Sequence, residues 1–97
     1  MKQKEVLNIL KSHQEELQRL GVKELTLFGS VARNEAGRRS DVDLLVEIER
    51  PMGLFGLLRI QYFIEKILGG VMVDLVTKEA LLEDIRDDIM EDSVRVI

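Results

Sequence analysis

The sequence contains no cysteine and only one histidine. Disulfide bonds, thiolate-ligated metals and a zinc site made from several histidines of one chain are therefore excluded. Any metal that this chain binds must be an ion that prefers oxygen ligands, such as magnesium. Apolar runs are also short, and none approaches the roughly 18 residues that a membrane-spanning helix needs. Residues 1–14 lack the small-residue cleavage site of a signal peptide, so we expect a cytoplasmic protein.

The length of 97 residues fits one domain, residues 1–97, with 45% hydrophobic and 33% charged residues. The formal net charge of −4 argues against a broad nucleic-acid surface and against nucleic acid as the direct substrate. A chain of this size buries a modest core and has little room for a deep pocket of its own. A large substrate would therefore be shared with another subunit, in a homo- or hetero-oligomer.

Hydrophobic periodicity predicts alternating helices and strands. Apolar residues at helical spacing predict a first helix over Lys2–Leu20, on which the single histidine, His13, is expected to be a packed residue. An α/β (α+β) fold follows, with a three-stranded sheet flanked by about four helices, although strand directions stay open at this point. The other expected elements are strands over 23–28, 41–48 and 71–76 and helices over 29–36, 54–68 and 79–92.

Acidic residues interrupt two of the predicted strands. Asp41 and Asp43 are two residues apart, so the alternation of a strand directs both carboxylates to one side. Asp74 interrupts the apolar run VMVDLV in the same way. Three carboxylates on one sheet face repel one another unless divalent cations neutralise them, which is the arrangement of a two-magnesium site for phosphoryl transfer. The alternative for each aspartate alone is a role at a strand end or in a turn.

A Gly-Ser pair precedes these aspartates at the end of the first strand. Gly29 lets a phosphate approach the backbone, and Ser30 offers a hydroxyl and free amides at a helix N-terminus, although a simple N-cap is the alternative. Arg33, one helical turn further on, is the strongest candidate among the nearby arginines to bind triphosphate oxygens. The remaining charged side chains are weaker candidates or expected surface residues: Arg38, Arg39, Glu35 and Glu47.

The combination of Gly29-Ser30, Asp41-x-Asp43 and a later strand aspartate, Asp74, resembles the nucleotidyltransferase superfamily that includes DNA polymerase beta. The motifs GSVAR and SDVDLLV are similar to the signature of its minimal nucleotidyltransferase (MNT) members, the MntA-like antitoxins of HEPN/MNT toxin-antitoxin systems. The resemblance covers the whole chain and implies a mixed sheet like the palm of polymerase beta. One departure is Asn34, which stands where the family pattern has glycine.

The resemblance also implies the chemistry. In the family, the Gly-Ser loop holds the nucleotide phosphates, and the three aspartates bind two Mg²⁺ ions. These roles carry over to Gly29, Ser30, Asp41, Asp43 and Asp74. The implied activity is transfer of AMP from ATP, with release of pyrophosphate, to a tyrosine of a partner HEPN ribonuclease toxin. We expect no acceptor domain in this chain, which fits a partner protein that is itself the acceptor.

Two other functions stay open on the sequence. The chain could be a non-catalytic binding module that neutralises its partner through the apolar surface of residues 54–68. It could also adenylylate a small molecule, with a second subunit completing the site. Fold alone does not decide among the three.

Overall fold

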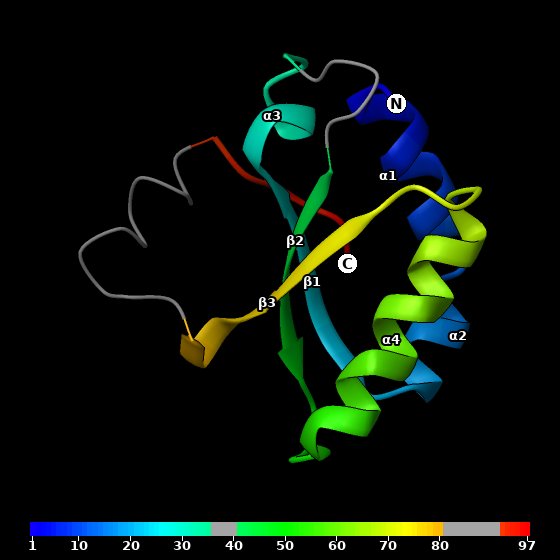
Figure 1. Cartoon of the computed structure of the whole chain (residues 1–97), viewed down its shortest axis with the longest axis vertical. Coiled ribbons are helices and arrows are strands. Elements are labelled where there is room, and N and C mark those ends of the chain that lie inside the picture. The colour runs from blue at the N-terminus through cyan, green and yellow to red at the C-terminus, as the bar shows by residue number, and fades with distance from the viewer. Residues whose placement is uncertain (36–40, 81–91) are drawn as a thin grey trace.

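The computed structural model describes residues 1–35, 41–80 and 92–97. Helices and strands alternate along the chain, as the periodicity predicts (Figure 1). The helices are α1 (Gln3–Ser12), α2 (Gln14–Arg19), α3 (Gly29–Ala32) and α4 (Gly53–Ile67), with a 3₁₀ helix, η1 (Lys78–Ala80). The strands are β1 (Val22–Phe28), β2 (Val42–Ile48), β3 (Val73–Thr77) and β4 (Val94–Arg95).

The described strands form one sheet in the order β3-β2-β1-β4. β1 runs antiparallel to both β2 and β4, whereas β2 and β3 are parallel, so the predicted mixed α/β fold is confirmed. The sequence predicted three strands and the structure has a fourth, β4, among the described residues. This strand is only two residues long, too short to show an alternating pattern.

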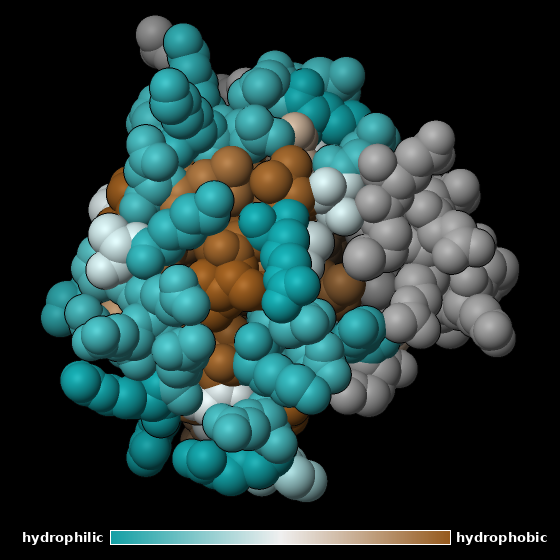
Figure 2. Space-filling view, turned by 180° about the vertical axis from the view of Figure 1, so that it is seen from behind, coloured by the Kyte–Doolittle hydropathy of each residue, from teal (hydrophilic) through white to brown (hydrophobic). Residues whose placement is uncertain are grey.

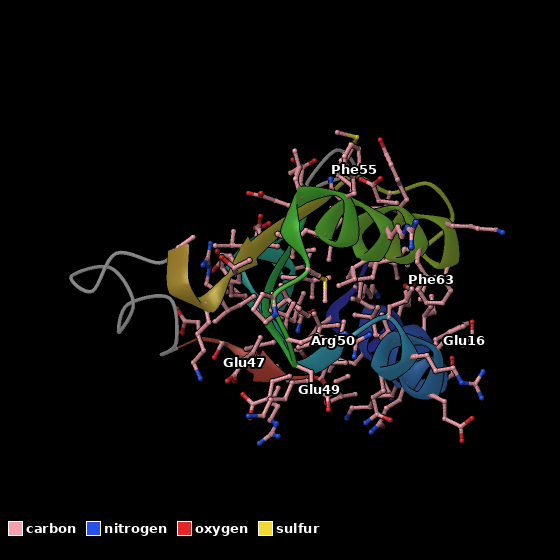
Figure 3. All side chains as sticks on the ribbon, turned by 90° about the horizontal axis from the view of Figure 1, so that it is seen from below. Glu16, Glu47, Glu49, Arg50, Phe55 and Phe63 are labelled. Carbon is pink, nitrogen blue, oxygen red and sulfur yellow. The ribbon has the colours of Figure 1, made fainter. Side chains whose placement is uncertain are left out.

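Helices α1, α2 and α4 lie on the same side of the sheet (Figures 1 and 3). Val42, Leu44 and Val46 of β2 are fully buried in the core beneath them. Because side chains alternate along a strand, Asp43 and Glu47 lie on the face of the sheet opposite α1, α2 and α4. Seen from behind, an apolar strip lies between hydrophilic side chains (Figure 2).

The predicted first helix is interrupted at His13. This residue leaves helical geometry, with φ −110° and ψ 21°, and separates α1 from α2. Its ring Nδ1 lies 2.8 Å from the carbonyl oxygen of Ile9, to which the hydroxyl of Ser12 also donates. The ring packs edge-on against Phe63 at a centroid distance of 6.0 Å. His13 is thus a packed residue, and side-chain hydrogen bonds compete with the helix there.

The predicted helix over residues 79–92 falls mostly outside the described residues. Its described start belongs to η1, and Asp92 lies in a turn. Among the helices of the described segments, none is long and apolar enough to cross a membrane.

Candidate active site

Gly29 follows β1 directly and opens the short helix α3. Its φ of +77° lies in the left-handed region, which favours glycine. The backbone of Gly29 also lies against the carboxylate of Asp43: a Cβ placed on Gly29 would overlap Asp43 Oδ2 and lie 3.0 Å from Asp43 Cγ. Conformation and space therefore both require glycine at this position, and the Gly-Ser turn touches one of the candidate aspartates.

Two of the three candidate aspartates are direct neighbours in the sheet. Asp43 of β2 and Asp74 of β3 are register partners in a parallel pair, so their side chains share the face opposite α1, α2 and α4. Asp41 lies two residues before Asp43, just ahead of β2. The sheet thus brings together two acidic residues, Asp43 and Asp74, that are 31 positions apart in the sequence.

The pKa of Asp43 reflects the proximity of the three aspartates. Burial raises the pKa of its carboxyl group, and the nearby charges of Asp74 and then Asp41 raise it further. Arg33 acts in the opposite direction, but its charge does not offset the others. Negative charge is therefore concentrated at this site, and the described residues do not neutralise it. Binding of a cation would neutralise it.

The carboxylate oxygens at this site are the ligand type that Mg²⁺ prefers. Asp41, Asp43 and Asp74 are the residues that would hold the ion, and the raised pKa of Asp43 fits a site with a deficit of positive charge. Within the parts of the chain that the structure describes, no group of three acidic, histidine or cysteine side chains is already arranged as a metal cluster. The three carboxylates are donors of the type that suits magnesium, but their joint coordination of an ion stays a prediction.

The other predicted nucleotide-binding residues lie on or next to α3. Ser30 is half-buried in its first turn, and its carbonyl accepts a hydrogen bond from the backbone N–H of Glu35 at 2.8 Å. Arg33 directs its Nε to Glu35 Oε2 at 3.1 Å, and the two side chains are 42% and 66% exposed. An exposed ion pair of this kind is weak, so Arg33 can exchange Glu35 for a phosphate. Arg38 and Arg39 lie outside the described residues.

The backbone conformation of Asn34 explains why asparagine can stand where the family pattern has glycine. Its φ of +58° is in the left-handed region, which glycine adopts readily and asparagine tolerates better than other residues. The side chain also accepts a hydrogen bond from the backbone N–H of Gln3 at 3.2 Å. Asparagine therefore replaces the expected glycine without distorting the turn after α3.

Substitution of Asn34 tests this explanation. We expect Asn34→Val to lower the free energy of unfolding by about 1–2 kcal/mol, because a β-branched residue is strained in the left-handed region. Asn34→Gly should stay within about 0.5 kcal/mol of the wild type, since glycine removes the strain and only a weak hydrogen bond is lost. Urea denaturation measures both, and equal effects would contradict the explanation.

Glu47 shares the face of Asp43 but belongs to a different cluster. Its carboxylate lies 3.5 Å from Lys78 Nζ and 3.9 Å from Lys23 Nζ. Desolvation acts to raise the pKa of Glu47, but the charges of Lys78 and Lys23 outweigh it and lower the pKa. Figure 3 shows Glu47 on the sheet side of the molecule, away from the helices that carry Glu16 and Phe63. The expectation of a surface role for Glu47 agrees with this ion-pair cluster.

The lowered pKa of Glu47 has a consequence for stability. The charged carboxylate stabilises the fold at pH values above its usual pKa of 4.5, and this contribution is lost as the pH falls through the lower, folded-state pKa. We therefore expect Glu47→Gln to reduce the free energy of unfolding at neutral pH, with the deficit disappearing in acid. Denaturation across that pH range measures it. Glu5→Gln, at an exposed position without an ion pair in the described residues, should show no such deficit.

Two polar residues of α4 hold the strand that carries Asp74. Glu65 Oε2 accepts a hydrogen bond from the Val73 N–H at 3.0 Å, and Gln61 Nε2 donates to the Val73 carbonyl at 3.1 Å. Sequence reasoning missed these residues. The signal in the sequence was the spacing of four between Gln61 and Glu65, which places both side chains on one face of the helix.

Comparison with known proteins gives one consistent result. The model of the nucleotidyltransferase domain family matches residues 4–96. A protein adenylyltransferase, MntA of Thermococcus cleftensis, is 39% identical over 93 residues, which cover 95% of this chain and 93% of that protein.

Solved structures agree with this match. A chain described provisionally as a minimal nucleotidyltransferase is 31% identical with a TM-score of 0.83, covering 97% of this chain and 95% of that one. A chain in a complex of tri-AMPylated Shewanella oneidensis HEPN toxin with MNT antitoxin has a TM-score of 0.66 at 14% identity. That match covers 94% of this chain and 71% of the other, and at this identity it shows the fold alone.

Proposed function

The chain belongs to the nucleotidyltransferase domain family, and from this premise we propose that it is an antitoxin that transfers AMP from Mg-ATP to a tyrosine hydroxyl of a HEPN-type ribonuclease toxin. The adenylyltransferase relative and the fold shared with a HEPN–MNT complex support the proposal. The observation that carries it is the register pairing of Asp43 with Asp74, beside a Gly29 backbone that touches the Asp43 carboxylate.

The reaction joins the tyrosine oxygen to the α-phosphorus of ATP and breaks the bond from that phosphorus to pyrophosphate, while the phenolic proton leaves to solvent. Gly29 and Ser30 bind phosphate oxygens through backbone N–H groups and the Ser30 hydroxyl. Asp41, Asp43 and Asp74 would hold the cations. Two bound Mg²⁺ ions would supply neutralisation of the triphosphate and activation of the acceptor hydroxyl. Arg33 stabilises negative charge on the phosphates.

In this proposal a partner protein supplies the acceptor hydroxyl. The test is incubation of the chain with its HEPN-type partner and Mg-ATP, followed by intact-mass spectrometry of the partner. We expect the mass of the partner to rise by one or more AMP units, on tyrosine, only when ATP and magnesium are both present. A partner that binds the chain yet keeps its mass would refute the proposal.

Neutralisation by binding alone is the second candidate, because α4 exposes large apolar side chains. Leu54 is 70% exposed, Phe55 80% and Tyr62 65%. Aromatic residues exposed in this way are typical of protein interfaces. An Asp41→Ala/Asp43→Ala double variant distinguishes the two functions: catalysis requires that it no longer neutralises the toxin, whereas occlusion requires that it neutralises as well as the wild type.

A further inference from the structure

A concave site lies at the end of the sheet opposite the candidate active site. Its volume is about 370 Å³, and its lining residues come from α2, from the connection after β2 and from the first turns of α4. The strand β2 separates the two sites, since Asp43 is near its start and Ile48 is its last residue. Five residues of extended strand span about 16 Å, so the two sites share no residue and cannot bind one small ligand together. The described lining residues are Arg19, Leu20, Arg50, Met52, Phe55, Gly56 and Arg59.

Positive charge is concentrated in this pocket. Three of its described lining residues are arginines and none is acidic, in a chain whose formal net charge is −4. Arg19 pairs with Glu15 at 4.0 Å, but both side chains are more than three-quarters exposed, so the pair is weak. Arg50 and Arg59 form no ion pair with any described residue. Guanidinium groups held around a cavity without carboxylates are suited to an anion from outside the chain.

An aromatic ring lies at the rim of the same pocket. Phe55 is 80% exposed and points outward from the start of α4, with Arg50 on the side of α4 that faces α2 (Figure 3). Leu20 and Met52 add apolar surface to the lining. A purely inorganic anion would use the arginines and leave the ring without a role. A ligand that carries both a phosphate and a planar base uses both, because bases stack on exposed aromatic faces.

We propose that this pocket, which we term the arginine pocket, binds a nucleoside phosphate, either free or as one unit of an RNA strand. The volume lies within the range of small-ligand sites, roughly 300–1,000 Å³, which suits one nucleotide better than an extended acidic peptide. The arginines bind the phosphate and Phe55 stacks on the base. The proposal does not depend on AMP transfer at the aspartates, because the arginine pocket contains none of those residues.

The test is an NMR titration of the ¹⁵N-labelled chain with AMP in the presence of EDTA, so that the magnesium-dependent site does not contribute. We expect saturable shifts of the backbone amides of Arg50, Phe55 and Arg59. Arg50→Ala/Arg59→Ala should weaken AMP binding about tenfold or more, since each guanidinium contributes a charge-assisted hydrogen bond. Phe55→Ala should weaken AMP about threefold or more and leave inorganic phosphate unchanged, because only the base stacks.

The matched control removes the same charge elsewhere. Lys11 and Lys66 are exposed and do not line the pocket, so Lys11→Ala/Lys66→Ala should change AMP affinity less than about twofold. A parallel titration with a 5′-phosphorylated oligoadenylate identifies the source of the ligand: tighter binding than AMP at the same amides indicates RNA, and equal or weaker binding indicates the free nucleotide.

Three results would overturn the proposal: no shift at the pocket with either probe, inorganic phosphate binding as tightly as AMP, or an arginine double variant that matches the lysine control. Chemical-shift changes confined to the amides of Gly29 and Ser30 also count as no binding at the arginine pocket. They would leave the proposed AMP transfer intact. A separate titration with Mg-ATP reports on Gly29 and Ser30, so failure of one proposal is distinguishable from failure of the other.

Discussion

Asp43→Asn is expected to reduce AMP transfer about 1,000-fold, which corresponds to about 4 kcal/mol of lost transition-state stabilisation. The carboxylate that is lost lies between the Gly29 backbone and Asp74. The same change should raise the free energy of unfolding in EDTA, because burial and the neighbouring charges of Asp74 and Asp41 disfavour the charged form of Asp43 in the folded chain. Transfer is measured as AMP incorporated into the partner, and stability by urea denaturation without metal.

A loss of transfer activity together with a gain of stability distinguishes a functional aspartate from a structural one. Glu47→Gln is the matched control, because Glu47 lies on the same strand and the same face but is paired with lysines. It should keep transfer activity and lose stability. An Asp43→Asn variant that is both less stable in EDTA and fully active would contradict the assignment.

Gly29→Ala should lower the free energy of unfolding by about 2–4 kcal/mol and reduce transfer at least about 100-fold. The left-handed conformation at φ +77° strains any other residue, and the added methyl group would overlap the Asp43 carboxylate. Displacing that carboxylate moves a proposed metal ligand out of place. Urea denaturation and the AMP-incorporation assay measure the two effects.

Gly69→Ala is the control that separates strain from overlap. Gly69 has a similar φ of +81°, but a Cβ there meets nothing within 4 Å. Only the strain remains, so we expect a loss of about 1–2 kcal/mol with full transfer activity. If the two alanine variants lose the same stability and the same activity, contact between Gly29 and Asp43 is not what the site requires.

Alternation and helical periodicity were sufficient to predict most of the fold. β2 shows why: Val42, Leu44 and Val46 are buried on one face, so the position of Asp43 on the other face follows from the strand period alone. The helix predicted over residues 54–68 is found at Gly53–Ile67 because its apolar stripe packs on this sheet.

Long-range pairing could not be predicted from local pattern. Nothing in the sequence of β2 or β3 shows that they are parallel neighbours, so the register of Asp43 with Asp74 had to come from the structure. The break at His13 depends on side-chain hydrogen bonds that compete with the helix. The two-residue strand β4 is recognised by its pairing with β1, which no local pattern predicts. The support that Glu65 gives to Val73 is likewise a tertiary contact.

The most direct test of the central claim is a crystal structure of the chain with Mg²⁺ and a non-hydrolysable ATP analogue. We expect metal ions coordinated by Asp41, Asp43 and Asp74 together, with the triphosphate against the backbone of Gly29 and Ser30. A metal bound without Asp74, or a triphosphate bound away from Gly29, would contradict the claim that these residues form the site of AMP transfer.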